Sequence, residues 1–310
     1  MDYLYALQCL RESGPEFVNY IFLFISEFFF MSGIVVSSYI YWCADKVAGC
    51  AILTGYSATC FVNQTVKNIA CVYRPWILDP RLHVDPVAAG SATGYSFPSG
   101  HTSSAAAVFG GISIWQRKRK GIVVLMSLGI LLVAFSRNWL GAHTIQDVLV
   151  AVAIAAVVLS LCVLVRYILA AHPGFDTWLS FGGIALAVIT LIILSVKSYP
   201  VDYGADGSVL VNPYDMLTDC YTATGVLTGT LLGMWLERRF VHFDVSTSHV
   251  ENLKTFIIGG LIIGVIYLSF SALFSFLGEH WCHFIKYFTM FFTILYLYPL
   301  GFNYVRRRRS

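Results

Sequence analysis

Three short polar segments hold most of the side chains in this sequence that could do chemistry. They are Lys67-x6-Arg74-Pro75, Pro98-Ser99-Gly100-His101 and Ser136-Arg137-x5-His143-x3-Asp147. Together they supply three cations, two histidines, one carboxylate and a glycine next to a serine. Cations and backbone N–H groups hold phosphate oxygens, and histidines transfer protons or attack phosphorus. The combination indicates phosphoryl transfer.

The histidine and aspartate of the third segment are four residues apart, at the start of an apolar run. On a helix this spacing puts His143 and Asp147 on one face, within reach of each other. A carboxylate on one ring nitrogen fixes the tautomer and leaves the other nitrogen as a nucleophile or base. A structural alternative is that Thr144 and Asp147 form a capping box, and the pair considered alone favours that cap.

The second segment precedes an apolar run that begins at Thr102. A helix starting there would present unpaired backbone N–H groups and the positive end of its dipole. Gly100 would let an anion approach the backbone, and Ser99 would cap the helix or donate to an oxyanion. A serine-capped helix start with an incidental His101 explains the four residues equally well when they are considered alone.

The elements that must position these groups are membrane helices. The chain has 310 residues, of which 57% are hydrophobic and 12% charged, with a mean hydropathy of +0.71. A soluble domain has about 25% charged residues, so this composition predicts an all-α polytopic membrane bundle. We expect about nine apolar segments, at 17–42, 48–66, 101–116, 121–137, 147–168, 178–196, 216–236, 255–277 and 284–305.

The Lys and Arg residues predict the orientation of these segments. Basic clusters occur at 117–120, at Arg166, at 238–239, at Lys254 and at 306–309. With nine crossings all of them fall on one side, which the positive-inside rule makes cytoplasmic. The N-terminus is then outside, the C-terminus inside, and the three polar segments face outward. Arg74 and Arg137 then lie against the charge bias, whereas Lys67 could simply snorkel at a helix end.

The three segments, in this order and with this internal spacing, resemble the signature of the type 2 phosphatidic acid phosphatase superfamily. All eleven signature positions match, and the resemblance covers about residues 20–196. That superfamily includes lipid phosphate phosphatases, undecaprenyl-diphosphate phosphatases and soluble vanadium haloperoxidases. The motifs are specific for the superfamily but not for its substrate.

The resemblance implies a role for each matching residue. His143 would attack phosphorus and form a phosphohistidine, and Asp147 would orient it. His101 would protonate the leaving group and later activate water. The phosphate oxygens would be held by Lys67, Arg74, Ser99, Gly100 and Arg137. The resemblance implies no metal or other cofactor.

The expected organisation has three parts. Residues 1–16 form an outward N-terminal segment, either an interfacial helix or a frayed terminus. Residues 17–196 form a six-helix phosphatase core, and residues 197–310 add three membrane helices and a basic C-terminal tail. The segments 102–116 and 121–136 are short, roughly 24 Å at 1.5 Å per residue, which predicts a site at headgroup depth.

We therefore expect a multi-pass membrane phosphatase acting on a lipid phosphate or diphosphate at the outer, or lumenal, face. The partners are this substrate and membrane lipids, with no nucleic acid, and a homodimer is open. The orientation also resembles that of glucose 6-phosphatase, so a soluble sugar phosphate is an alternative. A lipid phosphotransferase and a noncatalytic transporter or lipid-binding protein are further alternatives, although the complete charged set argues against the last.

Overall fold

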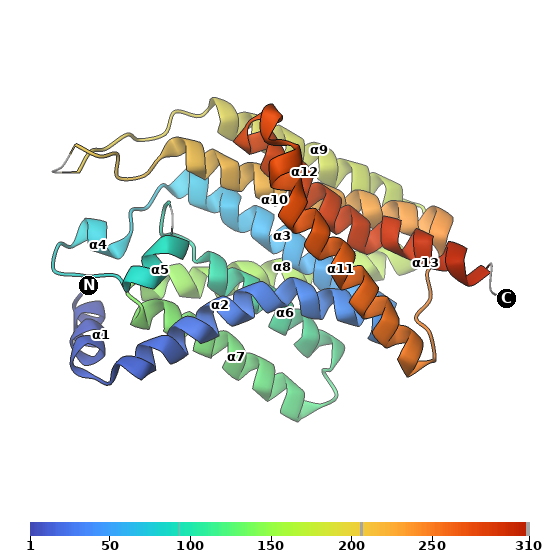
Figure 1. Cartoon of the computed structure of the whole chain (residues 1–310), viewed down its shortest axis with the longest axis horizontal. Helices are drawn as coiled ribbons and strands as arrows, with labels where there is room; N and C mark the ends of the chain where they lie inside the picture. Colours follow the sequence, from blue (N-terminus) through green and yellow to red (C-terminus); the bar gives the residue numbers. More distant parts are fainter. Residues whose placement is uncertain (93, 205–206, 308–310) are drawn as a thin grey trace. The chain divides into compact units, whose positions relative to one another are not determined.

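The described part of the chain is helical. The structure, a computed structural model, describes residues 1–92, 94–204 and 207–307, and in these ranges no strand occurs apart from a single bridge between Tyr203 and Val209. The long helices in Figure 1 are α2 (Glu16–Tyr39), α3 (Lys46–Ala70), α6 (Gly100–Trp115), α7 (Lys120–Trp139), α8 (Ile145–Ala171), α9 (Phe175–Val196), α10 (Pro213–Leu236), α11 (His249–Leu273), α12 (Glu279–Phe292) and α13 (Tyr298–Arg307). The remaining α-helices are α1 (Asp2–Ser13), α4 (Pro75–Leu78) and α5 (Pro86–Ser91). The predicted all-α class is confirmed.

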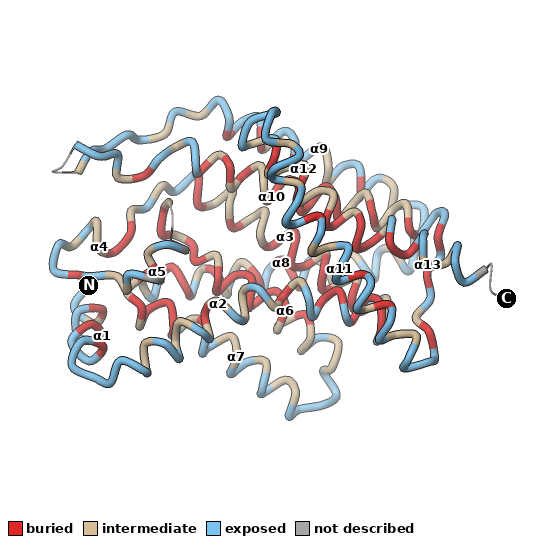
Figure 2. The backbone as a smooth tube through the Cα atoms, in the orientation of Figure 1, coloured by how far each residue is buried: buried red, intermediate tan, exposed pale blue. Residues whose placement is uncertain are grey.

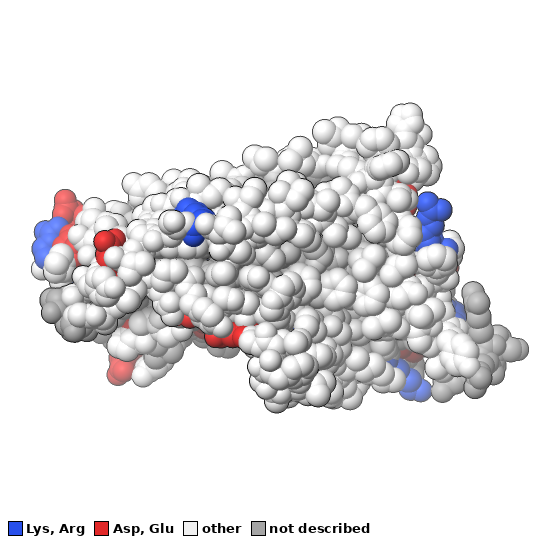
Figure 3. All heavy atoms as spheres, turned by 90° about the horizontal axis from the view of Figure 1, so that it is seen from above, with Lys and Arg blue, Asp and Glu red and all other residues white. Residues whose placement is uncertain are grey.

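Six helical stretches of the described chain are long and apolar enough to cross a membrane. They are Glu16–Ala44, Lys120–Trp139, Ile145–Ala171, Phe175–Val196, His249–Leu273 and Glu279–Arg306. They coincide with six of the predicted segments and indicate a multi-pass membrane protein. On the face seen in Figure 3, most atoms belong to uncharged residues and Lys, Arg, Asp and Glu are few.

The other three predicted segments are helical but fall outside this set. α6 has 16 residues, fewer than the about 20 needed to span the hydrocarbon core. α3 and α10 are long enough, at 25 and 24 residues. Both carry many hydroxyl, amide or charged side chains, which lower their mean hydropathy. The count of nine crossings and the orientation stay predictions.

α7 is longer than the apolar pattern predicts. It has 20 residues and ends at Trp139, so it is about 30 Å long rather than 24 Å. Helical structure continues through Arg137 and Asn138, which are polar but buried inside the protein. The length argument for headgroup depth therefore applies to α6 but not to α7.

Contacts divide the described chain into two compact units. The first unit contains Met1–Gly33, Val62–Leu159 and Val196–Leu217, and the second contains Ile34–Phe61, Ser160–Ser195 and the chain from Thr218 on. All eight predicted site residues lie in the first unit. The division by contacts does not test the predicted parts 17–196 and 197–310, which stay predictions. Of the predicted basic tail, Arg308 and Arg309 lie outside the described residues.

In the first unit, α6 is the buried helix. The residues from His101 to Val108 are all buried (Figure 2). Small side chains fill this stretch, from Thr102 to Ala107, so neighbouring backbone can approach closely. α6 packs on α7. The start of α6 therefore lies inside the protein rather than at its surface.

α1 braces the loops next to the predicted site. The Arg11 guanidinium is buried and donates to the carbonyl oxygens of Trp139, at 3.0 Å, and His83, at 2.5 Å. Tyr3 Oη accepts from the Ile145 N–H at 2.6 Å, at the first residue of α8. The N-terminal segment is thus a docked helix rather than a frayed terminus.

The second unit is held by close helix packing and buried hydroxyls. On α10, a Cβ at Gly225 or Gly229 would clash with the backbone of α12 at Phe284 or Phe288, so these positions require glycine. The hydroxyls of Ser57 and Thr230 lie 2.7 Å apart. Small residues and hydroxyl pairs are common between membrane helices, because lipid provides no hydrophobic force between them.

Candidate active site

The Pro98-Ser99-Gly100-His101 segment forms the N-terminus of α6. Ser99 is the N-cap, and its Oγ accepts from the Thr102 N–H at 3.4 Å. The Ser99 N–H donates to the Asp147 carbonyl oxygen at 3.1 Å, which ties this segment to the third one. Apart from its chain neighbours and the backbone of its own helix, no described atom lies within 4 Å of the place where a Cβ on Gly100 would sit. The helix start therefore has room for an anion next to its backbone.

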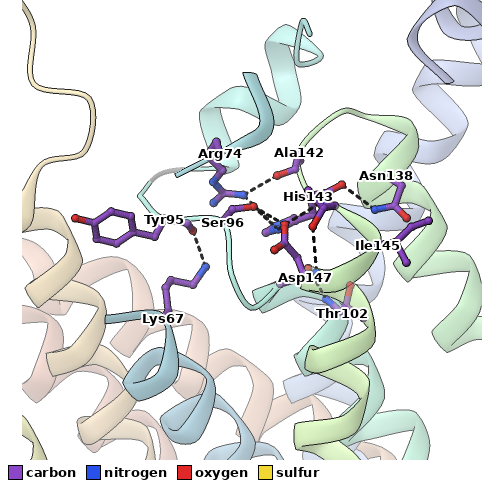
Figure 4. A network of polar contacts seen from close by, with 12 residues as sticks. Lys67, Arg74, Tyr95, Ser96, Thr102, Asn138, Ala142, His143, Ile145 and Asp147 are labelled. Carbon is purple, nitrogen blue, oxygen red and sulfur yellow. Dashed lines mark hydrogen bonds and ion pairs between the residues drawn. The ribbon is translucent and has the colours of Figure 1, made fainter. Parts of the chain in front are cut away.

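The third segment folds as the end of α7, a tight turn and the start of α8. Asp147 Oδ2 accepts from the Thr144 N–H at 2.7 Å, and the Asp147 N–H donates to Thr144 Oγ1 at 3.3 Å. This is the capping box that the sequence suggested as an alternative to a catalytic pair. The same Oδ2 also lies 3.4 Å from Nδ1 of His143 and accepts from Ser96 Oγ at 2.5 Å. Asp147 thus caps α8 and faces His143 at once (Figure 4).

The neighbours of His143 fix which ring nitrogen carries its proton. Nη1 of Arg74 lies 2.9 Å from Nε2 of His143. Arginine has only donors, so Nε2 must accept and the ring proton must be on Nδ1. Nδ1 then donates to Ser96 Oγ at 3.4 Å, whose own hydroxyl donates to Asp147. The lone pair of Nε2 is therefore directed at the Arg74 guanidinium.

His143 is buried among positive charges. Only 2% of its surface is exposed. Burial, followed by the charges of Arg74, Arg137 and Lys67, holds the pKa of His143 well below its ordinary value. The imidazole is therefore neutral at pH 7. All three predicted cations are therefore close enough to His143 to act on its imidazole.

Backbone carbonyl groups near His143 anchor the side chains of Lys67 and Arg74. Lys67 Nζ donates to the Tyr95 carbonyl oxygen at 2.9 Å. Arg74 donates through Nε to the Gly94 carbonyl oxygen at 3.0 Å and through Nη1 to that of Ala142 at 3.0 Å. Both side chains are buried. These bonds orient the cations without neutralising their charge, because a carbonyl carries no net charge.

Arg137 is fully buried and only partly paired. Its Nη1 donates to Ser26 Oγ at 2.8 Å and lies 3.8 Å from Glu27 Oε1. Its Nε and Nη2 have no hydrogen-bond partner among the described residues. Buried guanidinium nitrogens without partners are costly, and two adjacent N–H groups match the fork geometry that binds phosphate oxygens.

His101 follows the helix start and faces α2. Its Nε2 lies 3.3 Å from Oε1 of Glu27, and its ring lies 4.3 Å from that of Phe30, centroid to centroid. Hydrogen bonds and close contacts join four of the eight predicted residues, Ser99, Arg74, His143 and Asp147. Glu27 lies next to His101 and Arg137, and the His143 N–H donates to the Arg137 carbonyl oxygen at 3.2 Å, which connects the two sets.

Several polar residues of the site were not predicted from the sequence. Ser96 links His143 to Asp147, Asn138 Nδ2 donates to the His143 carbonyl oxygen at 2.8 Å, and Asn63 Nδ2 donates to Ser103 Oγ at 2.8 Å. Glu27 had a sequence signal, because it is the only acidic residue inside the apolar run 17–42. The three others have neighbours distant in the sequence and no spacing that marks them.

The histidines of the His280–His283 stretch make aromatic and hydroxyl contacts. The His280 ring stacks on Tyr221 at 5.1 Å, and His283 Nδ1 lies 3.1 Å from Thr222 Oγ1. Among the described residues, no group of three or more His, Cys, Asp or Glu side chains could hold a metal ion.

Two family models match this chain. One, described as the PAP2 superfamily, matches residues 46–171. The other, described as the PAP2 superfamily phosphatase transmembrane extension, matches residues 221–309. The last three predicted segments, which the motif resemblance left outside, therefore match an extension of the same superfamily. No curated protein and no solved structure matches the chain.

Proposed function

We propose a phosphohistidine mechanism at His143 for this chain, which belongs to the PAP2 superfamily of membrane phosphatases. The observation that carries the proposal is the 2.9 Å contact between Arg74 Nη1 and His143 Nε2. It puts the lone pair of a neutral imidazole beside a guanidinium that can bind phosphate. A phosphate oxygen on that guanidinium would bring phosphorus to the nucleophilic nitrogen.

In the first step, Nε2 of His143 forms a bond to phosphorus and the bond to the ester oxygen breaks. His101 gives its proton to that oxygen, so the leaving group departs as a neutral alcohol. The proton on Nδ1 stays in place, held by Ser96 and the Asp147 carboxylate. Asp147 stabilises the positive charge that develops on the ring.

In the second step, water attacks the phosphohistidine. His101, now neutral, takes a proton from that water, while the bond between phosphorus and Nε2 breaks. Inorganic phosphate leaves, His143 is again neutral, and His101 again carries its proton. Atoms and charge return to the starting state after each turnover.

The phosphate oxygens are held by Lys67, Arg74, Arg137, the Ser99 hydroxyl and the Gly100 N–H. The transferred group carries charge on three equatorial oxygens, and these donors would surround them. The two unpartnered nitrogens of Arg137 and the open space above Gly100 support this assignment.

A lipid phosphate or diphosphate is the proposed substrate class, acted on at the outer face of the membrane. On α2, Phe24, Phe28 and Met31 are exposed next to Glu27, so apolar surface adjoins the polar site. A lipid tail could remain in the bilayer while its headgroup enters. The outward side follows from the basic clusters at 117–120 and 238–239, which the positive-inside rule makes cytoplasmic.

The test is phosphate release by the full chain in detergent micelles from a panel of lipid monophosphates, lipid diphosphates and soluble sugar phosphates. We expect turnover of lipid phosphates and a loss of about 1,000-fold or more in His143→Ala, with unchanged gel-filtration behaviour. Preference for a soluble sugar phosphate would overturn the substrate class. Retained turnover in His143→Ala would overturn the mechanism.

A further inference from the structure

Glu27 is an ionisable residue inside a candidate membrane span. It lies in the stretch Glu16–Ala44, between the apolar residues Ile25 and Phe28. A carboxylate in such a helix is costly, and such residues usually face a polar partner with a function. Neither the phosphatase motifs nor the proposed function assigns it a role.

One face of α2 meets the side chains of His101 and Arg137. Ser26 accepts from Arg137 at 2.8 Å, and Glu27 lies 3.3 Å from Nε2 of His101. The Phe30 ring contacts the His101 ring in a tilted arrangement, with 4.3 Å between the centroids. Residues 27 and 30 are three apart, so they share a helix face. α2 therefore contacts the imidazole at two places, at Nε2 through Glu27 and against the ring through Phe30.

The Glu27 carboxylate brings a negative charge close to His101 but does not occupy the hydrogen-bonding capacity of Nε2. Nε2 of His101 is buried and makes no aligned hydrogen bond within the described residues, although the carboxylate is 3.3 Å away. Nε2–H can therefore still donate to a substrate oxygen. Burial, followed by the charge of Arg137, lowers the pKa of His101 to about 4, and the Glu27 carboxylate opposes this lowering.

We propose that Glu27 is a positioning residue that favours the protonated form of His101 and orients it for donation to the leaving oxygen. The proposal rests on the proposed function, since it concerns the same site. The proton moves from His101 Nε2 to the ester oxygen as the bond between that oxygen and phosphorus breaks and the bond to His143 Nε2 forms. Glu27 itself gains and loses no proton in this step.

A purely structural role for Glu27, as a counterion of Arg137, predicts a different pattern. The distance from Glu27 Oε1 to Arg137 Nη1 is 3.8 Å. If Glu27 mattered only through Arg137, its loss would weaken phosphate binding for every substrate alike. If it acts through His101, its loss matters only when the leaving group needs a proton.

The test compares two classes of leaving group in the full chain in detergent micelles. p-Nitrophenyl phosphate leaves as a stable anion, whereas an alkyl phosphate, the one that wild type cleaves fastest, needs protonation. The quantity compared is kcat/KM, which reports the steps up to departure of the leaving group. Glu16→Gln, which changes an exposed acid on the same helix, is the matched control.

We expect Glu27→Gln to lower kcat/KM about 10- to 100-fold for the alkyl phosphate and less than about threefold for p-nitrophenyl phosphate. Glu27→Asp keeps the charge and should retain more alkyl phosphatase activity than Glu27→Gln. In a His101→Gln background, adding Glu27→Gln should cause no further loss, because both changes remove the same proton donation.

Equal losses for both substrates, an additive loss in the His101→Gln background, or an unchanged Glu27→Gln enzyme would each overturn the inference. If Glu27→Gln fails to fold, the comparison is made with Glu27→Asp, where a loss equal for both substrates overturns it. Wild type that cleaves none of these phosphates would instead overturn the proposed function. The two failures are thus distinguishable.

Discussion

Asp147 and His143 are joined by a carboxylate oxygen that serves two purposes. Oδ2 of Asp147 lies 3.4 Å from Nδ1 of His143, and the same oxygen accepts the Thr144 N–H at 2.7 Å. The helix cap and the histidine partner, which the sequence presented as alternatives, are one arrangement. The cap fixes the direction of the Asp147 carboxylate, and the carboxylate in turn fixes the orientation of the His143 ring.

The two purposes of Asp147 can be separated by substitution. Asn can still cap a helix but carries no charge. We expect Asp147→Asn to keep the thermal stability of wild type and to lower kcat about 100- to 10,000-fold. Thr144→Ala, which weakens the cap and leaves the charge, should lower Tm and retain most activity. Equal kinetic losses in both variants would contradict this division.

Gly100→Ala should separate stability from phosphate binding. A Cβ at this position meets no described atom within 4 Å, so the substitution should not lower Tm. The methyl group would occupy the space assigned to a phosphate oxygen. We expect KM to rise about tenfold or more, a loss of about 1.4 kcal/mol of binding. Gly121→Ala, at the start of α7, also meets no described atom and serves as the control. An unchanged KM in Gly100→Ala would contradict the assignment of the helix start.

The pH dependence follows from the lowered pKa of His143. The nucleophile must be neutral, so the activity that depends on His143 is lost as the pH drops through its pKa. Burial and the neighbouring cations hold that pKa below the ordinary value, so the acid limb of kcat/KM assigned to His143 should lie below about pH 6.5. Lys67→Met removes one of those positive charges and should move the limb to higher pH. Arg81→Gln, at an exposed loop position paired with Asp79, is the control and should not move it. A shift of the limb to lower pH in Lys67→Met would contradict the account.

The hydrogen bonds of Arg11 indicate that α1 stabilises the fold. Its guanidinium donates to the Trp139 and His83 carbonyl oxygens from a buried position. Arg11→Leu leaves both oxygens without that donor and should cost about 1–3 kcal/mol of unfolding free energy. We expect a lower Tm. Any loss in kcat should be no larger than the loss of folded protein accounts for. An unchanged Tm would show that α1 is not a brace.

The sequence predicted the phosphatase family and the groups that the structure places around His143, because motif spacing is a local property. His143 lies two residues before α8 rather than on it, and Asp147 is in the first turn of that helix. The four-residue spacing still brings the two side chains together, and Ser99 caps α6, so short-range geometry suffices for both. The family assignment made from these motifs is confirmed.

What the sequence did not predict depends on contacts between distant segments. Glu27 meets His101 only because α2 packs beside the start of α6, and Ser96 meets Asp147 across 51 positions. The extent of α7 was underestimated because Arg137 and Asn138 are polar yet helical and buried. Polar residues facing a site inside a membrane protein resemble loop residues when hydropathy alone is considered.

The central claim is a covalent bond between phosphorus and Nε2 of His143, and chemical trapping of the phosphoenzyme tests it most directly. Wild-type protein mixed with a phosphorus-labelled lipid phosphate, quenched within milliseconds and digested under alkaline conditions, should yield one labelled peptide containing His143. The label should be lost in acid, as expected for a phosphohistidine, and should be absent from His143→Asn. Label on another residue, or turnover without any labelled peptide, would contradict the mechanism.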